Sequence, residues 1–381
     1  MTESPRKSSR RELLSSLQSP AAHNPVGNRE SKGDAKRQPP AGGSTIRLSA
    51  RAMACDFSVI LNPSAHPPIE SAGEALERIH AAETWMSIYR EHSEMSEVNR
   101  SAAHGPVTVS QDFLRLLESA FELFRATDGG FDLAAGRLTT LWRTARKSGS
   151  LPTPEQVLLA RDSSGLSHVR IAPDARTVEF THPSLMLDPG AIGKGFALDD
   201  AGDWLTSRPD APANFLLHGG HSSLLAKGTH GSNDGWPVGL GNPLLTEKRM
   251  ATVLLRDQAM GTSGSNIQFF RHGGRRYGHI LNPETGWPAE GVLSVTVFAR
   301  SAATADALST AFFAIGPEKA VECCRRMPEI GCILTPMPDR GTVLRPLVFG
   351  VSPDRIFWDE QQVQPQFLDL LPPSVAKLPQ T

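Results

Sequence analysis

Apolar residues recur every three or four positions in several parts of the chain, which is the spacing of a helix with one buried face. In residues 70–86, for example, Ala72, Leu76 and Ile79 share such a face. Gly and Pro residues after several of these segments mark where a helix would end. Helices are predicted at 70–86, at 110–127, after a glycine-rich stretch and up to about 205, at 302–315 and at 317–327.

Shorter apolar runs bounded by Gly, Asn and Pro predict strands. These runs lie at 53–61, 169–171, 177–180, 215–220, 222–227, 236–240, 251–256, 258–262, 277–281 and 293–299. Residues 91–99 are interpreted as a polar segment and 147–154 as a surface excursion. Because helices and hairpins mix without regular βαβ alternation, the predicted fold class is α+β with mixed helices and antiparallel sheet.

Composition divides the chain into three predicted regions. Residues 1–44 carry eight basic against four acidic side chains and almost no large apolar residues. Such a segment cannot offset its ordering entropy by burial, so a disordered basic N-terminal arm is expected. Residues 45–350 are expected to form one domain, and residues 351–381 an extended tail rich in Pro and Gln.

The overall composition excludes several classes of protein. The chain has 381 residues, 39% of them hydrophobic, and no apolar run approaches the ~20 residues that span a bilayer, so a soluble protein without a transmembrane segment is expected. A net charge of −1 argues against nucleic acid as a partner. The four cysteines lack CxxC spacing, which indicates neither a zinc site nor a disulfide framework.

The N-terminus bears on the cellular compartment. Residues 9–11, Ser-Arg-Arg, are similar to the start of a twin-arginine export signal. No apolar segment follows them, so a cytoplasmic location is expected and export remains the alternative.

The stretch 188–199 contains three glycines and Lys194 within six residues and leads into a predicted helix. Glycines allow a close backbone approach or a positive φ, and a helix N-terminus offers free N–H donors to an anion. The spacing matches neither the P-loop nor the dinucleotide-binding motif. An anion site and a plain tight turn are both compatible with it.

Several further residues could carry chemistry. Asp306 and Thr310 are four residues apart on a predicted helix, so they can offer two hard oxygen ligands to Mg²⁺; alternatively, Asp306 interacts with the helix dipole and Thr310 with its own backbone. His279 precedes an Asn-Pro turn and could act as a general base. Cys55 is a possible nucleophile or a half-buried strand residue. Tyr89 and Tyr277, the only tyrosines, lie beside motif-like segments.

Taken together, these motifs resemble the ApbE family of FAD:protein FMN transferases over roughly residues 46–336. The motifs occur in the family order: Met53-Ala54-Cys55, Ser87-Ile88-Tyr89-Arg90, Gly130-Phe131-Asp132, the 188–199 stretch, His218-Gly219-Gly220, Thr262-Ser263-Gly264, the segment 279–286 and Ala305-Asp306-Ala307-Leu308-Ser309-Thr310.

The resemblance implies a T-fold-like α+β domain that binds FAD, as its substrate, and Mg²⁺. Members transfer FMN from FAD to a Thr or Ser hydroxyl of an acceptor protein and release AMP. By position, the residues implied at the FAD site are Met53, Tyr89, Gly130, Phe131, Asp132, Asp188, Lys194 and the backbone of Ile280 and Leu281. The resemblance implies metal binding by the side chains of Asp306 and Thr310 and by the Ala191 carbonyl. It also implies that His279 deprotonates the acceptor hydroxyl.

The chain departs from the family pattern at some positions. Residues 221–223 read His-Ser-Ser where members more often have a short acidic or amide residue. Cys55 occupies a position where members commonly have a small or hydroxyl residue. Position 194 varies between Lys and Glu among the members. Two alternatives to transfer are a Mg²⁺-dependent FAD hydrolase that yields FMN and AMP, and a non-catalytic FAD-binding protein.

Overall fold

The structure is a computed structural model that describes residues 39–40, 42–265, 268–358 and 363–370. Contacts divide the chain into a unit that ends at Gln38 and a unit that begins at Pro39, and the second unit is described below. Most of the predicted N-terminal arm, residues 1–38 and 41, lies outside the described residues.

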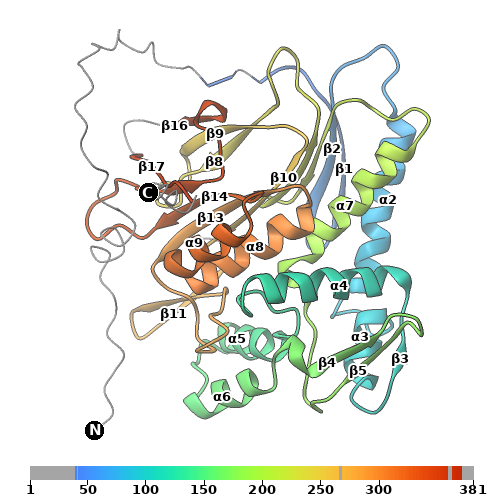
Figure 1. The fold of residues 1–381 in the computed structure, drawn as a ribbon, viewed down its shortest axis with the longest axis vertical. Coiled ribbons are helices and arrows are strands. Elements are labelled where there is room, and N and C mark those ends of the chain that lie inside the picture. Colours follow the sequence, from blue (N-terminus) through green and yellow to red (C-terminus); the bar gives the residue numbers. More distant parts are fainter. Residues whose placement is uncertain (1–38, 41, 266–267, 359–362, 371–381) are drawn as a thin grey trace, which may run out of the picture. The chain divides into compact units, whose positions relative to one another are not determined.

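A nine-stranded sheet runs through the described part of the chain (Figure 1). All of its neighbouring strands are antiparallel except the last pair, β15 and β17. In spatial order the strands are β1 (Ile46–Ala52), β2 (Cys55–Leu61), β6 (Phe215–Gly219), β7 (Ser223–Lys227), β10 (Gln258–Gly264), β13 (Val292–Ala299), β14 (Gly331–Pro336), β15 (Leu347–Phe349) and β17 (Gln366–Phe367).

Three helices pack on one face of this sheet: α2 (Ile69–Met86), α7 (Gly193–Ser207) and α8 (Ala302–Ile315). Side chains alternate between the two faces of a strand. In β7, Leu225 lies against Gly202 of α7, whereas Leu224 and Ala226 join a hydrophobic cluster on the other face. In β10, Gly261 permits the close approach of α8. Helix α9 (Pro317–Arg326) follows α8.

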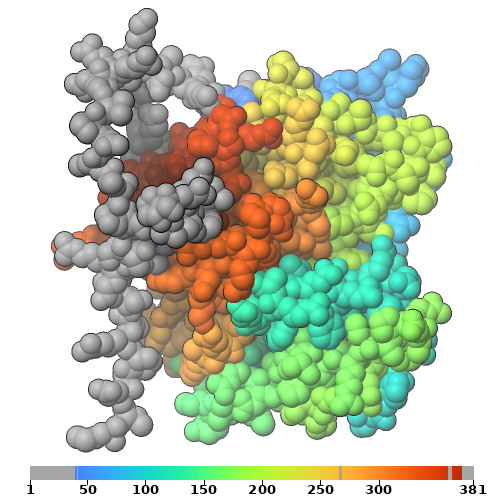
Figure 2. All heavy atoms as spheres, viewed as in Figure 1, coloured from blue at the N-terminus to red at the C-terminus, as the bar shows by residue number. Residues whose placement is uncertain are grey.

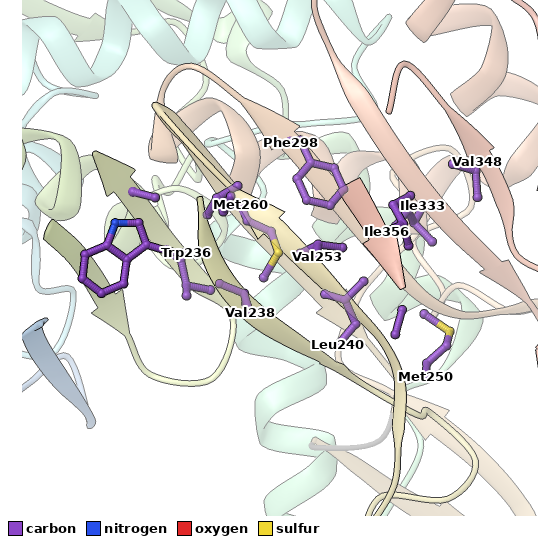
Figure 3. Close-up of a cluster of buried hydrophobic side chains, with 14 of the residues drawn as sticks. Trp236, Val238, Leu240, Met250, Val253, Met260, Phe298, Ile333, Val348 and Ile356 are labelled. Carbon is purple, nitrogen blue, oxygen red and sulfur yellow. The ribbon is translucent and has the colours of Figure 1, made fainter. Parts of the chain in front are cut away.

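A second sheet covers the opposite face. It consists of β8 (Trp236–Gly241), β9 (Arg249–Leu255) and β16 (Ile356–Trp358). Figure 3 shows the buried cluster between the two sheets, which includes Trp236 and Val253 from the smaller sheet and Met260 and Phe298 from the larger one. Because β16 pairs with β9 and β17 with β15, the described residues of the predicted tail pack on the domain.

A further layer of helices carries much of the candidate site. It contains α3 (Glu94–Ser101), α4 (Gln111–Ala126), α5 (Gly136–Ser148) and α6 (Pro154–Asp162), the small sheet of β3 (Val107–Thr108), β5 (Thr177–Phe180) and β4 (Val169–Ala172), and the hairpin of β11 (Phe269–His272) and β12 (Arg275–Gly278). Single turns of 3₁₀ helix occur at η1 (Leu166–His168), η2 (Pro189–Ala191) and η3 (Pro353–Arg355).

The predicted α+β class is confirmed, as are the five predicted helices. The polar segment 91–99 contains a helix that was not predicted, α3, with Ser93 accepting a hydrogen bond from the Ser96 N–H at 3.0 Å. The strand predicted from residue 53 starts at Cys55, since Met53 and Ala54 have positive φ and form the turn between β1 and β2. The strand predicted at 277–281 ends at Gly278.

None of the described helices combines the length and the apolar character needed to cross a membrane.

Candidate active site

The glycine-rich stretch brings the N-terminal ends of two helices together. Asp188 is the N-cap of η2, and its Oδ1 accepts a hydrogen bond from the Gly190 N–H at 2.9 Å. Gly195 lies in the first turn of α7, where an added Cβ would be 2.1 Å from the Ala302 carbonyl oxygen of α8. The glycine therefore serves the close approach of two helices rather than a positive φ.

The N-terminus of α7 binds an anion that belongs to the protein itself, the carboxylate of Asp306. The N–H of Gly195 donates to Oδ2 of Asp306 at 2.8 Å, as expected where a helix N-terminus meets a carboxylate. The hydroxyl of Ser223 donates to both carboxylate oxygens, at 2.6 and 2.9 Å. Lys194 Nζ lies 3.6 Å from the same Oδ2.

Asp306 is only 4% exposed, and burial raises its pKa while Lys194, Ser223 and Gly195 N–H oppose the rise. A carboxylate removed from water in this way gains strongly from a nearby cation. In the described residues, one lysine and two hydrogen-bond donors interact with it.

A cluster of hydroxyl groups adjoins the backbone carbonyl of Asp306. The Oγ1 of Thr310 lies 3.0 Å from Ser263 Oγ, which in turn lies 2.9 Å from Ser309 Oγ. Thr310 also donates to the Asp306 carbonyl at 3.2 Å, which is the backbone bond expected as the alternative to metal binding. The signal for Ser263 was present in the motif Thr262-Ser263-Gly264.

The residues present fit a magnesium ion in the chemistry of their donors. A carboxylate, a threonine hydroxyl and a backbone carbonyl are hard oxygen ligands, and Mg²⁺ takes few of them from protein because it keeps waters and phosphates. The described residues contain no group of three His, Cys, Asp or Glu side chains that could hold a metal. Besides Asp306, the predicted ligand set therefore includes the hydroxyl of Thr310 and the carbonyl of Ala191. Ala191 lies in η2, which packs against α8.

His279 follows β12 directly, and its Nδ1 lies 3.1 Å from the carbonyl oxygen of Gln268. If Nδ1 carries the proton and donates it there, Nε2 is free to accept one. Burial lowers the pKa of His279, the Gln268 carbonyl opposes this, and the charges of Arg146 and Lys194 lower it further. Lys194 thus acts on both His279 and Asp306.

The backbone after His279 is held by a tight turn. The Ile280 carbonyl accepts from the Ala289 N–H at 2.9 Å, and Leu281 bridges to Pro288. Asn282 secures this turn to α8 by donating to the carbonyl of Ala314 at 3.1 Å. The predicted FAD-contacting backbone of Ile280 and Leu281 is therefore fixed relative to the helix that carries Asp306.

Asp188 and Tyr89, two predicted FAD-site residues, meet through a residue that sequence reasoning missed. Arg143 Nη2 lies 3.0 Å from Asp188 Oδ2, and its guanidinium lies 5.3 Å from the Tyr89 ring centre. Thr139, one turn earlier on α5, donates to the same Asp188 oxygen at 2.7 Å. Tyr89 is 75% exposed, which leaves its ring accessible to a ligand.

Met53, at the turn between β1 and β2, is joined to the Tyr89 segment by a glutamate. The N–H of Met53 donates to Glu83 Oε1 at 2.9 Å, and Arg90 Nη2 lies 3.3 Å from Glu83 Oε2. This brings together two predicted FAD-site segments that are distant in sequence.

Gly130 and Asp132 line a cavity of about 350 Å³. Its walls come from the ends of α4 and α8, from α6, α9 and the turn after His279, and Figure 2 shows the orange surface of α8 and α9 beside the teal surface of α4. Asp132 accepts from the N–H groups of Ala134 and Leu166, and burial raises its pKa to about 6. The side chain of Phe131 is buried and does not line the cavity.

The surroundings of two other candidate residues, Cys55 and Tyr277, indicate a structural role. Burial raises the pKa of Cys55, so its thiol stays protonated at neutral pH, which argues against an activated nucleophile. Tyr277 is buried and stacks on Trp142 with ring centres 6.0 Å apart, as expected for a residue at the core edge.

Comparisons with known proteins identify the family of this chain. A model described as ApbE family matches residues 44–334. A relative named FAD:protein FMN transferase from Haemophilus influenzae is 29% identical over 249 residues, which are 63% of this chain and 71% of the relative. A relative of the same name from Treponema pallidum is 31% identical over 279 residues, 70% of this chain and 77% of the relative.

A solved structure shares the fold. The crystal structure of the ApbE protein from Thermotoga maritima superposes with a TM-score of 0.70 at 26% identity and covers 77% of this chain and 94% of its own. The family match includes every segment of the candidate site from Met53 to Thr310. The chain therefore belongs to the ApbE family.

Proposed function

We propose that this protein transfers FMN from FAD to a Thr or Ser hydroxyl of an acceptor protein. Relatives that match most of the chain are named FAD:protein FMN transferase. The observation that carries the proposal is the buried carboxylate of Asp306, which Lys194 connects electrostatically to His279. This arrangement supports a site that combines a cation-binding group with a proton acceptor.

The proposed reaction is a displacement at phosphorus. The acceptor oxygen forms a bond to the phosphorus of the FMN half of FAD, and the bond from that phosphorus to the bridging oxygen breaks. AMP leaves with the bridging oxygen, and the proton of the acceptor hydroxyl is lost to a base. The products are an FMN phosphoester on the acceptor and AMP.

Asp306, Thr310 and the Ala191 carbonyl would hold Mg²⁺, which, when bound, supplies positive charge to the pyrophosphate of FAD. Hydrogen bonds from Ser223 and Gly195 fix the orientation of the Asp306 carboxylate. Such supporting partners of a metal ligand typically contribute 10- to 100-fold in metal affinity. Lys194 would add a second positive charge beside the phosphates.

His279 would take the proton from the acceptor hydroxyl at Nε2, because Nδ1 faces the Gln268 carbonyl. A positioned base of this kind contributes typically ~10²–10⁴-fold to rate. The lowered pKa of His279 keeps the ring neutral, and so able to accept a proton, at neutral pH.

FAD would extend along α8 between the two ends of the site. Thr310 lies one turn after Asp306 on α8, and Ile315, five residues later and roughly 7.5 Å along the helix, lines the cavity with Gly130 and Asp132. A cavity of this size suits part of a dinucleotide. Asp188 and Tyr89, joined by Arg143, would contact FAD outside the cavity.

Covalent flavin transfer tests the proposal directly. The protein is incubated with FAD, MgCl₂ and an extract that contains candidate acceptors, and a denaturing gel is read for flavin fluorescence. We expect a fluorescent band whose Thr or Ser carries an FMN adduct by mass spectrometry, and no band with Asp306→Asn. AMP released at the same rate with and without acceptor, with no labelled protein, would instead identify an FAD hydrolase.

We also propose a cytoplasmic location on the basis of thiol chemistry. All four cysteines are free, including the adjacent Cys323 and Cys324, which suits a reducing compartment. Fractionation of cells that express the full chain tests this, and recovery with periplasmic or extracellular markers would contradict it.

A further inference from the structure

The hairpin of β11 and β12 has two faces of different character. Phe270 and Tyr277 pair across it and stack on each other, with ring centres 5.4 Å apart, and Tyr277 also stacks on Trp142 of α5. Side chains one position along each strand point the other way. That outer hairpin face carries Phe269, Arg271 and Arg276.

The outer hairpin face places two positive charges directly opposite each other. Arg271 and Arg276 are cross-strand partners, an arrangement that destabilises a two-stranded sheet. Burial and the charge of Arg271 lower the pKa of Arg276. Residues 268–279 contain three arginines and no Asp or Glu. Arg275 forms an ion pair with Glu290, so the positive charge of the outer hairpin face comes from Arg271 and Arg276.

An exposed aromatic ring lies among these charges. Phe269 is one of the few large apolar side chains of the described residues that remain well exposed, at 38%. The Arg276 guanidinium lies 3.9 Å from its ring centre. Its cross-strand partner is Gly278, which has no side chain to cover the ring. Arginine and exposed aromatic residues together are typical of protein–protein contact surfaces.

The outer hairpin face adjoins the candidate base. Gly278, opposite Phe269, immediately precedes His279, and the His279 ring contacts the carbonyl of Gln268, the residue before Phe269. Arg276 also donates to the carbonyl of Ser265, close to the Ser263 of the hydroxyl cluster. A polypeptide bound along this face would therefore lead to His279 (β11 is labelled beside α5 in Figure 1).

We propose that the outer hairpin face docks an acidic segment of the acceptor protein that flanks its target Thr or Ser. This rests on the proposed flavin transfer. Carboxylates of the acceptor would separate the like charges of Arg271 and Arg276, and an apolar acceptor side chain would cover Phe269. Docking would thereby deliver the acceptor hydroxyl to Nε2 of His279.

The substitution Arg271→Glu tests the proposal without risk to the fold. A glutamate opposite Arg276 replaces a repulsive pair by an attractive one, so the melting temperature should not fall. The matched control is Lys248→Glu, the same change of charge at an exposed position between β8 and β9. The acceptor is the protein recovered with an FMN adduct, used intact.

Initial rates of adduct formation are measured against acceptor concentration. We expect Arg271→Glu to raise the KM for the acceptor roughly tenfold and to weaken its salt dependence, with kcat and the Kd for FAD unchanged. Replacement of acidic residues that flank the labelled acceptor residue by Asn or Gln should raise KM as well, and the two changes together should be less than additive.

An unchanged KM for Arg271→Glu, or an acceptor without acidic residues beside the labelled position, would overturn the docking while leaving flavin transfer intact. Failure of the wild-type protein to label any acceptor, although it binds FAD, would instead refute the proposed function. A third outcome is that the wild-type protein sediments with phosphatidylserine vesicles, that Arg271→Glu abolishes this binding, and that the KM for the acceptor is unchanged. This outcome would assign the outer hairpin face to a membrane surface and overturn the proposal.

Discussion

Arg143 and Asp188 form an ion pair, Nη2 to Oδ2 at 3.0 Å, that joins helix α5 to the turn before α7. The same guanidinium lies over Tyr89, so one residue holds two segments that are predicted to contact FAD. Charge-assisted hydrogen bonds of this kind are shorter and stronger than neutral ones. Arg143 is therefore placed to set the orientation of both Asp188 and Tyr89.

We predict that Arg143→Gln raises the Kd for FAD roughly tenfold, the equivalent of about 1.4 kcal/mol, because Asp188 loses its charged partner. Quenching of flavin fluorescence on titration measures this. The matched control is Arg137→Gln, an exposed arginine on the same helix whose side chain donates to the Ser184 carbonyl instead. Equal FAD affinity in the two variants would show that the ion pair does not organise the FAD site.

A second prediction concerns the contact between α7 and α8. In Gly195→Ala the new methyl would lie 2.1 Å from the Ala302 carbonyl oxygen, so a helix has to shift. We expect a loss of about 1–3 kcal/mol in the free energy of unfolding, or more, and a lower melting temperature by calorimetry. Gly73→Ala in α2, where nothing lies within 4 Å of the added atom, should stabilise the protein by about 0.5–1 kcal/mol.

Sequence patterns predict relations between residues that are close in the chain, and they miss contacts between residues that are far apart in it. The relation between Asp306 and Thr310 is local, four residues on one helix, and was predictable. The contacts of Asp306 with Gly195 and Ser223 join residues 111 and 83 positions apart, which no local pattern reveals. The sequence marked Ser223 only as one of residues 221–223, where the chain departs from the family pattern.

The same reasoning explains the elements that were missed. Helix α5 carries Arg137, Arg143, Arg146 and Lys147 in thirteen residues, so its apolar face is narrow and its periodicity weak. It is stabilised by Trp142, whose ring packs against Phe270 and Trp287 from distant segments. Because the helix was not predicted, Arg143 was not recognised as a partner of Asp188.

The support that Ser223 gives to Asp306 leads to a third prediction. Ser223→Ala removes two hydrogen bonds to the buried carboxylate. We expect the Mg²⁺ concentration for half-maximal transfer to rise about 10-fold or more, with kcat at saturating Mg²⁺ largely kept. Ser222→Ala, next to it in sequence, is the control, since Ser222 Oγ contacts Ser223 rather than Asp306. An unchanged Mg²⁺ requirement in Ser223→Ala would argue against Asp306 as a metal ligand.

The last prediction concerns the pH dependence of transfer. Burial and the charges of Arg146 and Lys194 lower the pKa of His279, so its neutral, proton-accepting form persists below the ordinary histidine value of about 6.5. The acid limb of kcat should therefore lie below that pH. Arg146→Gln removes one of the two cations, so the pKa of His279 should rise and the acid limb should move to higher pH.

Rates of adduct formation at saturating FAD, Mg²⁺ and acceptor, measured across the acid range, test this shift. His279→Gln should lose most of the activity and the limb together, because no group then takes the acceptor proton at that position. Arg137→Gln, which removes an equal charge from the same helix without acting on His279, should leave the limb in place. The proton transfer would be assigned to another group if the acid limb of kcat does not move in Arg146→Gln and is still present in His279→Gln.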